Sequence, residues 1–272
     1  MTMTTTIPKL QFIYFAVRAR CEAPRMILEY GKIPYTDSSV GGYFGGKSWP
    51  EVKAAGLVPF GQLPVLVVSG NDGSAAAAAA AAATTTTTLL AQEAAISWYC
   101  ATLVPGLLPE DPLLRAQCEA IFHAAEELSP SNPVVNVFKG ETFAAKKEDY
   151  LTNILPRRLR NFHRLLANSG GPFTMGASPT YADFKLYHHL SNTRLIDATA
   201  LDQCGDDVIP TFMAAVEGLP GVKEYLERRP AAIDVGTKPM LEPNVCGSRF
   251  VDPTAAPAAE EPDAKKAKKG GD

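Results

Sequence analysis

The sequence predicts a small α/β domain followed by an all-α domain. Three observations lead to this prediction. Strand-like and helical segments alternate over roughly the first hundred residues, a proline-rich segment at 104–112 then interrupts them, and every periodic segment from there to about residue 230 has helical spacing. The predicted divisions are an α/β domain at 7–103, a linker at 104–112, an all-α domain at 113–235 and a disordered tail at 236–272.

The α/β domain is predicted from the order of its elements. Alternating apolar residues predict strands, apolar residues three or four apart predict helices, and glycine or proline marks the turns. The elements in chain order are a strand at 9–15, a helix at 21–30 capped by Gly31, a strand at 34–40, a helix at 49–55, a strand at 64–68 and a strand ending at Leu89 and Leu90 before a closing helix. A βαβ unit followed by a hairpin and a helix is the thioredoxin-like pattern.

Two segments have compositions that cannot build a core. Residues 70–88 contain nine alanines followed by five threonines, which predicts a low-complexity insertion in the turn between the third and fourth strands. The tail ends in the lysine-rich "KKAKK", which we interpret as solubilising; a targeting or anchoring signal is the alternative.

The all-α domain is predicted to begin at a helix with a clear start signal. Asp111 and Pro112 fit an N-cap and a first helical residue. Helically spaced apolar residues then form one stripe: Leu114, Cys118, Ile121, Ala125 and Leu128. Further along, "TYAD" at 180–183 fits a capping box, which gives Asp183 a structural role.

Charge and cysteine content limit the partners and the cellular compartment that we expect for the protein. The net charge of −3 gives no reason to expect a nucleic acid or an anionic membrane as partner. The N-terminus lacks the pattern of a signal peptide, and no stretch is apolar for long enough to span a bilayer. Five cysteines without metal-binding spacing fit a reduced, cytoplasmic setting: Cys21, Cys100, Cys118, Cys204 and Cys246.

A family resemblance emerges from five motifs that occur in the same order and spacing. The sequence resembles the cytosolic glutathione transferases, and most of all their sigma class, which includes the haematopoietic prostaglandin D synthases and the S-crystallins. The resemblance runs from about residue 9 to residue 230 and leaves out the alanine/threonine insertion. The motifs are "YFAVRARCEAPRMIL", "SWPEVK", "PFGQLPVL", "AQEAAISWY" and "ASPTYADF".

The resemblance implies that Tyr14 is a catalytic residue. Glutathione is then the co-substrate, and its thiolate is the nucleophile. A tyrosine hydroxyl aimed at the sulfur donates a hydrogen bond that stabilises the anion, and Arg20 matches an arginine that adds positive potential near it. In the absence of this context, Tyr14 would be read as an ordinary strand aromatic.

The same resemblance assigns the groups that hold the glutathione peptide. Trp49 and Lys53 match residues that bind the glycyl carboxylate, and they lie four apart on one helix. In "QLPV" the family pattern implies a cis Leu63–Pro64 bond that turns the backbone of Leu63 towards the cysteinyl part, with Gln62 adding a side-chain contact. The alternatives are a buried anchor Trp49, a solvated Lys53 and an ordinary strand-entry proline.

At the γ-glutamyl end the sequence departs from the sigma pattern. That pattern is Gln-Ser at a helix start, whereas this chain has Gln92-Glu93. A glutamate there would repel the α-carboxylate of the ligand but could pair with the α-ammonium group. Family members are two-fold dimers in which an acidic residue of the partner subunit approaches this site. The resemblance therefore implies a homodimer, and Glu119 is the best match for that acidic residue.

Other polar residues have simpler interpretations. His188 and His189 are adjacent on one helix and point about a hundred degrees apart, so they cannot chelate a metal together without outside ligands, and we interpret them as packing residues. Glu119, His123, Glu126 and Glu127 form a polar stripe that is solvated or faces the partner subunit, with metal binding as the alternative. Cys21 lies within the first motif, at the start of its helix, and does not replace Tyr14, which disfavours a cysteine-dependent mechanism.

The leading hypothesis is therefore a glutathione transferase that acts in detoxification and attacks a hydrophobic electrophile. The electrophile pocket is expected between the domains, against Phe15, Val17 and the helix at 112–128. A glutathione-dependent prostaglandin or lipid-peroxide isomerase uses the same tyrosine and is one alternative. A catalytically weak protein with a structural or scaffolding role is another, and Glu93 and the insertion favour it.

Overall fold

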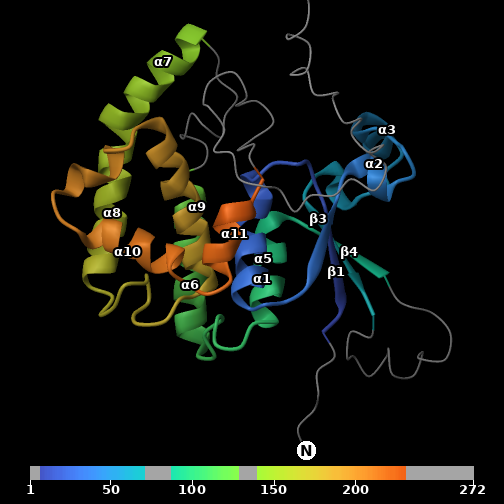
Figure 1. Cartoon of the computed structure of the whole chain (residues 1–272), viewed down its shortest axis with the longest axis horizontal. Helices are drawn as coiled ribbons and strands as arrows, with labels where there is room; N and C mark the ends of the chain where they lie inside the picture. The colour runs from blue at the N-terminus through green and yellow to red at the C-terminus, as the bar shows by residue number, and fades with distance from the viewer. Residues whose placement is uncertain (1–6, 71–86, 129–139, 231–272) are drawn as a thin grey trace, which may run out of the picture.

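The computed structural model has the predicted fold, a mixed four-stranded sheet with helices followed by a helical domain (Figure 1). It describes residues 7–70, 87–128 and 140–230. The predicted tail at 236–272, with its lysine-rich end, and residues 71–86 of the predicted insertion lie outside the described residues. No helix among the described residues is long and apolar enough to cross a membrane.

The sheet has the strand order β2-β1-β3-β4. Its strands are β1 (Lys9–Ile13), β2 (Tyr35–Ser38), β3 (Val65–Ser69) and β4 (Thr87–Ala91). β1 pairs parallel with β2 and antiparallel with β3, and β3 pairs antiparallel with β4. All four predicted strands are present. β4 begins at Thr87, so the last two residues of the predicted insertion belong to this strand.

The two faces of the sheet pack on different helices. The helices of this half are α1 (Glu22–Tyr30), which follows a 3-10 turn at Ala19–Cys21, α2 (Val40–Tyr43), α3 (Trp49–Ala54) and α5 (Glu93–Thr102). Phe12 and Leu66 join the main core with α1 and α5. Ile13 and Val65 point the other way, into a smaller core with Val52 of α3. This alternation follows from the two-residue period of a strand.

The second half of the described chain is helical. Its helices are α6 (Pro112–Glu126), α7 (Gly140–Asp149), a π-helical turn at Tyr150–Ile154, α8 (Leu155–Ala167), α9 (Tyr181–Ile196), a 3-10 turn at Ala200–Cys204, α10 (Val208–Glu217) and α11 (Val222–Arg228). As predicted, the Asp111 carboxylate caps α6 by accepting hydrogen bonds from the backbone N–H groups of Leu113 and Leu114. Of the predicted apolar stripe, Leu114 is exposed, and Phe122 is buried instead.

Polar contacts join the two halves where α1 meets α11. Both carboxylate oxygens of Glu22 are used, one by the hydroxyl of Tyr225 at 2.8 Å and the other by Arg229 at 3.0 Å. Arg228 pairs with Glu29 at 2.6 Å. Because Glu22 is buried, these partners offset the cost of removing its charge from water. The halves are therefore fixed to one another by directional contacts as well as by the shared core.

The central helix α9 begins with the predicted capping box. The Asp183 carboxylate accepts hydrogen bonds from the backbone N–H and hydroxyl of Thr180, at 2.7 and 2.9 Å. It also accepts one from the backbone N–H of Thr174 at 2.8 Å. Burial raises the pKa of Asp183, and these hydrogen bonds oppose that effect. Asp183 thus orients a helix whose side chains are buried except for Arg194 and Leu195.

We expect Asp183→Ala to lower the free energy of unfolding by about 2 to 4 kcal/mol, because three buried donors lose their acceptor. Urea denaturation measures the change. Asp197→Ala is the matched control, since the Asp197 carboxylate accepts similar local hydrogen bonds from Thr199 at the surface. Equal losses in the two variants would contradict the structural role of Asp183.

Candidate functional site

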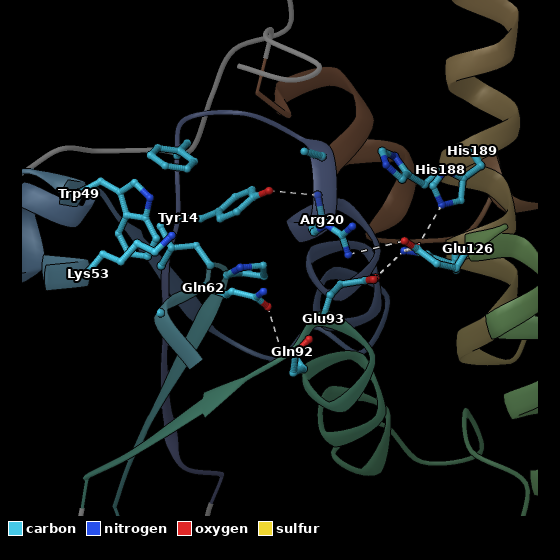
Figure 2. A pocket seen from close by; sticks show the side chains of 16 residues that line it. Tyr14, Arg20, Trp49, Lys53, Gln62, Gln92, Glu93, Glu126, His188 and His189 are labelled. Atoms are coloured by element: carbon cyan, nitrogen blue, oxygen red, sulfur yellow. Dashed lines mark hydrogen bonds and ion pairs between the residues drawn. The ribbon is translucent and has the colours of Figure 1, made fainter. Parts of the chain in front are cut away.

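A pocket of about 480 Å³ lies where the sheet half of the molecule meets α6 and α9 (Figure 2). It brings together nine of the residues that the sequence assigns to the site. These are Tyr14, Arg20, Trp49, Lys53, Gln62, Leu63, Pro64, Gln92 and Glu93. They come from five separate segments of the α/β half, so only the fold brings them to one place.

Tyr14 follows directly after β1 and lies in the middle of the pocket. Its backbone N–H donates a hydrogen bond to Ser38 at 3.0 Å, which extends the pairing of β1 with β2 by one residue. The ring is largely buried, and the hydroxyl accepts a hydrogen bond from the backbone N–H of Arg20 at 3.3 Å. Figure 2 shows this hydroxyl pointing away from Trp49 and towards Arg20. The packing of the ring therefore fixes Tyr14, and its hydroxyl faces the pocket.

Arg25 of α1 fixes the loop between Tyr14 and α1. This buried side chain donates a hydrogen bond to the backbone C=O of Val17 at 2.8 Å and pairs with Asp37 of β2 at 2.9 Å. The Arg20 guanidinium, by contrast, is mostly exposed and lies 3.6 Å from Glu126 of α6. The loop thus presents one positive charge close to the Tyr14 hydroxyl.

Aromatic contacts connect Tyr14 with the opposite end of the pocket. The ring of Phe15 lies 5.7 Å from that of Tyr14 and packs edge-on against Trp49 with 6.5 Å between ring centroids. Trp49 is the first residue of α3, and Lys53 is one turn further along. Lys53 is exposed, so its ammonium group is available at this end of the pocket.

The wall between these ends is formed by the turn into β3 and by the start of α5. The Leu63–Pro64 bond is cis, as the resemblance implies. The Gln92 amide donates a hydrogen bond to the Gln62 side-chain oxygen at 3.0 Å, so the two glutamines lie side by side at the rim. Gln92 has a positive φ of 72° and leads directly into α5. The first backbone N–H groups of α5 therefore lie next to the pocket.

Glu93, which lines the pocket, forms an ion pair. Its carboxylate pairs with the ammonium of Lys185 from α9 at 2.6 Å, and Lys185 also pairs with Glu126. Glu93 and Lys185 are buried, and Glu126 is about a quarter exposed. Burial raises the pKa of Glu93, and Lys185 acts in the opposite direction. One ammonium thus neutralises much of the charge of two carboxylates from different helices.

Two histidines complete the α9 side of the pocket. His188 and His189 line it, with 5.0 Å between their ring centroids, and His189 lies 3.7 Å from Glu126. Burial lowers the pKa of His189 to about 4, although Glu126 opposes this effect, and burial also lowers the pKa of His188. Both imidazoles are therefore neutral at pH 7. Burial would raise the pKa of Glu126, but His189 and Lys185 outweigh it and lower that pKa to about 2.

Relative to the pocket, Val17 and α6 lie differently from the sequence-based expectation, whereas the expectation for Glu119 concerns the ligand of a partner subunit. Glu119 is not among the described residues that line the pocket, and its carboxylate contacts His123 at 3.0 Å and the hydroxyl of Tyr181 in its own chain. Val17 is buried in the core rather than lining the pocket, and α6 contributes Glu126 alone. The expected approach of Glu119 to a partner's ligand stays a prediction.

Sequence reasoning missed Lys185 and Glu126 as site residues and assigned the two histidines to packing alone. One signal was available, because Lys185 stands within an otherwise buried helix, where a lysine requires a partner.

The alternatives based on cysteine and metal chemistry receive no support from the described residues. Cys21 is fully buried, and burial raises the pKa of its thiol, which is the opposite of what a reactive thiolate requires. Within residues 7–70, 87–128 and 140–230, no group of three or more histidine, cysteine or acidic side chains could hold a metal ion.

We expect Lys185→Met to lower the free energy of unfolding by about 3 to 5 kcal/mol, because it leaves two carboxylates near one another without their shared cation. Chemical denaturation at pH 7 measures the loss. Lys53→Met, which removes an exposed lysine from the same pocket, should change stability by less than about 0.5 kcal/mol. A Lys185→Met variant as stable as Lys53→Met would show that the cluster contributes little.

The neutral His189 predicts a loss of stability in mild acid. Its pKa is lower in the folded protein than in the unfolded chain, so the unfolded chain binds a proton first as the pH falls below about 6.5. The free energy of unfolding should drop by about 2 kcal/mol between pH 7 and pH 5 from this group. His189→Gln should remove that part of the drop. An unchanged pH dependence in the variant would contradict a neutral His189.

Comparison with known proteins shows which proteins this chain resembles. Residues 131–229 match the family model "Glutathione S-transferase, C-terminal domain". Glutathione S-transferase 1 of Ascaris suum is 25% identical over 228 residues, which cover 82% of this chain and 98% of that protein. Hematopoietic prostaglandin D synthase of Mus musculus is 24% identical, with 82% of this chain and 98% of that protein covered.

A solved structure of known class has the same fold as this chain. The Pi-class glutathione S-transferase of Onchocerca volvulus superposes with a TM-score of 0.64 at 23% identity and covers 80% of this chain and 92% of its own. The match spans both halves of the molecule, in agreement with the strand order and the helical second half. Over four fifths of its length, the chain is therefore similar to proteins of the glutathione transferase family.

Proposed function

We propose that this protein is a glutathione transferase in which the Tyr14 hydroxyl stabilises the thiolate of bound glutathione. The observation that carries the proposal is the position of that hydroxyl in a pocket that also holds Trp49 and Lys53 at one end and Gln92 and Glu93 along its side. The pocket offers groups suited to each part of a small anionic peptide, and the phenol lies among them.

The energy of one hydrogen bond is sufficient for this role. Lowering a thiol pKa of about 8.5 by about two units requires about 2.7 kcal/mol, within the roughly 1.5 to 3 kcal/mol of a hydrogen bond to a charged group. The backbone N–H of Arg20 orients the phenol, and the Arg20 guanidinium adds positive potential beside it. The thiolate then attacks the electrophilic carbon of the second substrate.

The rest of the peptide has matching partners. Lys53 and Trp49 are placed for the glycyl carboxylate, and the turn at Leu63 and Pro64 for the cysteinyl part, with Gln62 and Gln92 beside it. The expected repulsion from Glu93 is offset by its ion pair with Lys185. This pair removes the main argument for a catalytically weak protein with only a structural role.

We propose a hydrophobic electrophile as the second substrate. Phe15 and Ala19 offer apolar surface next to Tyr14 in the pocket. Similarity to a prostaglandin D synthase supports assignment to the sigma class and keeps isomerisation of a prostaglandin or lipid peroxide as the second candidate. A role in detoxification follows from the transferase reaction.

We also propose a cytoplasmic homodimer. The four cysteines in the described part of the chain are free thiols, which fits a reducing compartment. Large apolar side chains are exposed at Phe60, Trp98 and Leu113, with 77%, 41% and 68% of their surface accessible. In the proposed dimer, a second copy covers part of this exposed apolar surface.

Tyr14→Phe should lower the rate of glutathione conjugation to an aryl halide by about 10- to 100-fold at pH 7, since the thiol would return towards its ordinary pKa. The absorbance of the conjugate, followed over time, measures this rate. Tyr43→Phe, on α2 outside the pocket lining, is the control and should keep full activity.

Full activity in Tyr14→Phe would refute the tyrosine mechanism. No conjugation and no glutathione binding by the unmodified protein would refute the transferase proposal and favour a structural role.

A further inference from the structure

A second cavity, of about 520 Å³, lies in the helical half of the molecule. It is formed by α8 and by the end of the 3-10 turn at Ala200–Cys204. Figure 1 shows α8 on the side of the helical half that faces away from the sheet. Among the described residues, this cavity and the Tyr14 pocket have no lining residue in common. A ligand bound here therefore leaves the candidate active site free.

Three arginine side chains of α8 line this second cavity. Arg157, Arg160 and Arg164 are three and four residues apart, which places them on one face of the helix. All three are exposed, and none forms an ion pair within the part of the chain that the structure describes. Like charges at this spacing repel one another. An anion that binds between them removes this repulsion.

The remaining lining groups supply no negative charge to balance the arginines. None of the described side chains that line the cavity is acidic. His163 also lines it, and its Nε2 atom lies 2.7 Å from the carboxylate of Asp206, which is exposed beside the cavity. Asp206 is therefore paired with the histidine, and the positive charges of the three guanidinium groups face the cavity.

The three guanidinium groups suit a phosphate group better than a carboxylate. Guanidinium groups donate paired hydrogen bonds to the oxygens of both kinds of anion. A phosphate monoester carries a charge of about −1.5 to −2 at pH 7 and three strong acceptor oxygens. A carboxylate has a single charge and two oxygens. One phosphate can therefore accept hydrogen bonds from several arginines at once.

The shape of the cavity and its surroundings favour a small organic molecule over an extended polyanion. The volume lies within the roughly 300 to 1,000 Å³ of small-molecule sites. Pro156 and Leu159 supply an apolar wall, and Asn161 and Gln203 supply side-chain amides. The exposed Asp206 would repel the neighbouring phosphates of a nucleic acid.

We propose that this cavity binds a small organic phosphate. Arg157, Arg160 and Arg164 hold the phosphate group, and the organic part lies against Pro156 and Leu159. The site is separate from the Tyr14 pocket and does not depend on the proposed transferase activity.

Isothermal titration calorimetry of the full chain with 1-naphthyl phosphate tests the proposal. At pH 7 and low ionic strength, where exposed charges are least screened, we expect a dissociation constant below about 1 mM. Two matched compounds separate the contributions of its parts. 1-Naphthoate replaces the phosphate by a carboxylate, and inorganic phosphate lacks the rings. Each should bind at least about 10-fold more weakly, because each loses one kind of contact.

Paired substitutions locate the site. Arg160→Gln combined with Arg164→Gln should weaken the binding of 1-naphthyl phosphate at least about 10-fold. Lys32→Gln combined with Lys223→Gln is the matched control, because it removes the same charge at exposed positions outside the cavity. The control should change the dissociation constant by less than about twofold. A thermal melt verifies that each variant is folded.

Lys53→Gln removes a cation from the Tyr14 pocket and distinguishes the two cavities. Binding that is weakened by Lys53→Gln but not by the arginine pair would place the ligand in that pocket and overturn the proposal. Equal losses in the arginine and lysine pairs would indicate general surface charge and also overturn it.

The unmodified protein gives a test that needs no variant. A dissociation constant above about 1 mM for 1-naphthyl phosphate would overturn the proposal. Equal affinity for 1-naphthoate would overturn the preference for phosphate, and equal affinity for inorganic phosphate would overturn the role of the apolar wall. If the arginine pair does not fold, this series of compounds together with Lys53→Gln decides the question.

Discussion

The interaction on which the site depends is the ion pair between Lys185 and two carboxylates. Lys185 belongs to α9, Glu93 to α5 and Glu126 to α6, so a single ammonium group joins both halves of the molecule. Glu126 in turn lies near the Arg20 guanidinium, and the Arg20 backbone holds the Tyr14 hydroxyl. A connected series of polar contacts therefore runs from Glu93 at the start of α5 to the Tyr14 phenol.

This arrangement explains how a buried glutamate can lie beside the pocket at the start of α5. An isolated buried Glu93 would either take up a proton or repel the ligand. Burial raises the pKa of Glu93, and the ion pair with Lys185 opposes this effect and balances the negative potential of the ionised carboxylate. The arrangement requires α9 to be fixed in rotation and position. The Asp183 capping box at its start and the packing of its buried side chains meet that requirement.

The sequence predicted most of what depends on local patterns and little of what depends on helix packing. The strands, the capping residues Asp111 and Asp183 and the cis bond before Pro64 all lie in short recognisable stretches. Thr87 and Thr88 were assigned to the insertion because their composition masked the strand preference of threonine. A lysine in a buried helix indicated that Lys185 needs a partner, but the involvement of Glu126 and His189 could not be predicted, because it depends on which faces of α6 and α9 meet the sheet half.

The most direct test of this account is the pKa of the glutathione thiol when it is bound. Ultraviolet absorption of the thiolate, followed as a function of pH in the complex, measures it. The account predicts a pKa about two units below that of free glutathione, and a value close to the free one in Tyr14→Phe. An unshifted thiol in the unmodified complex, or an equal shift in the variant, would contradict it.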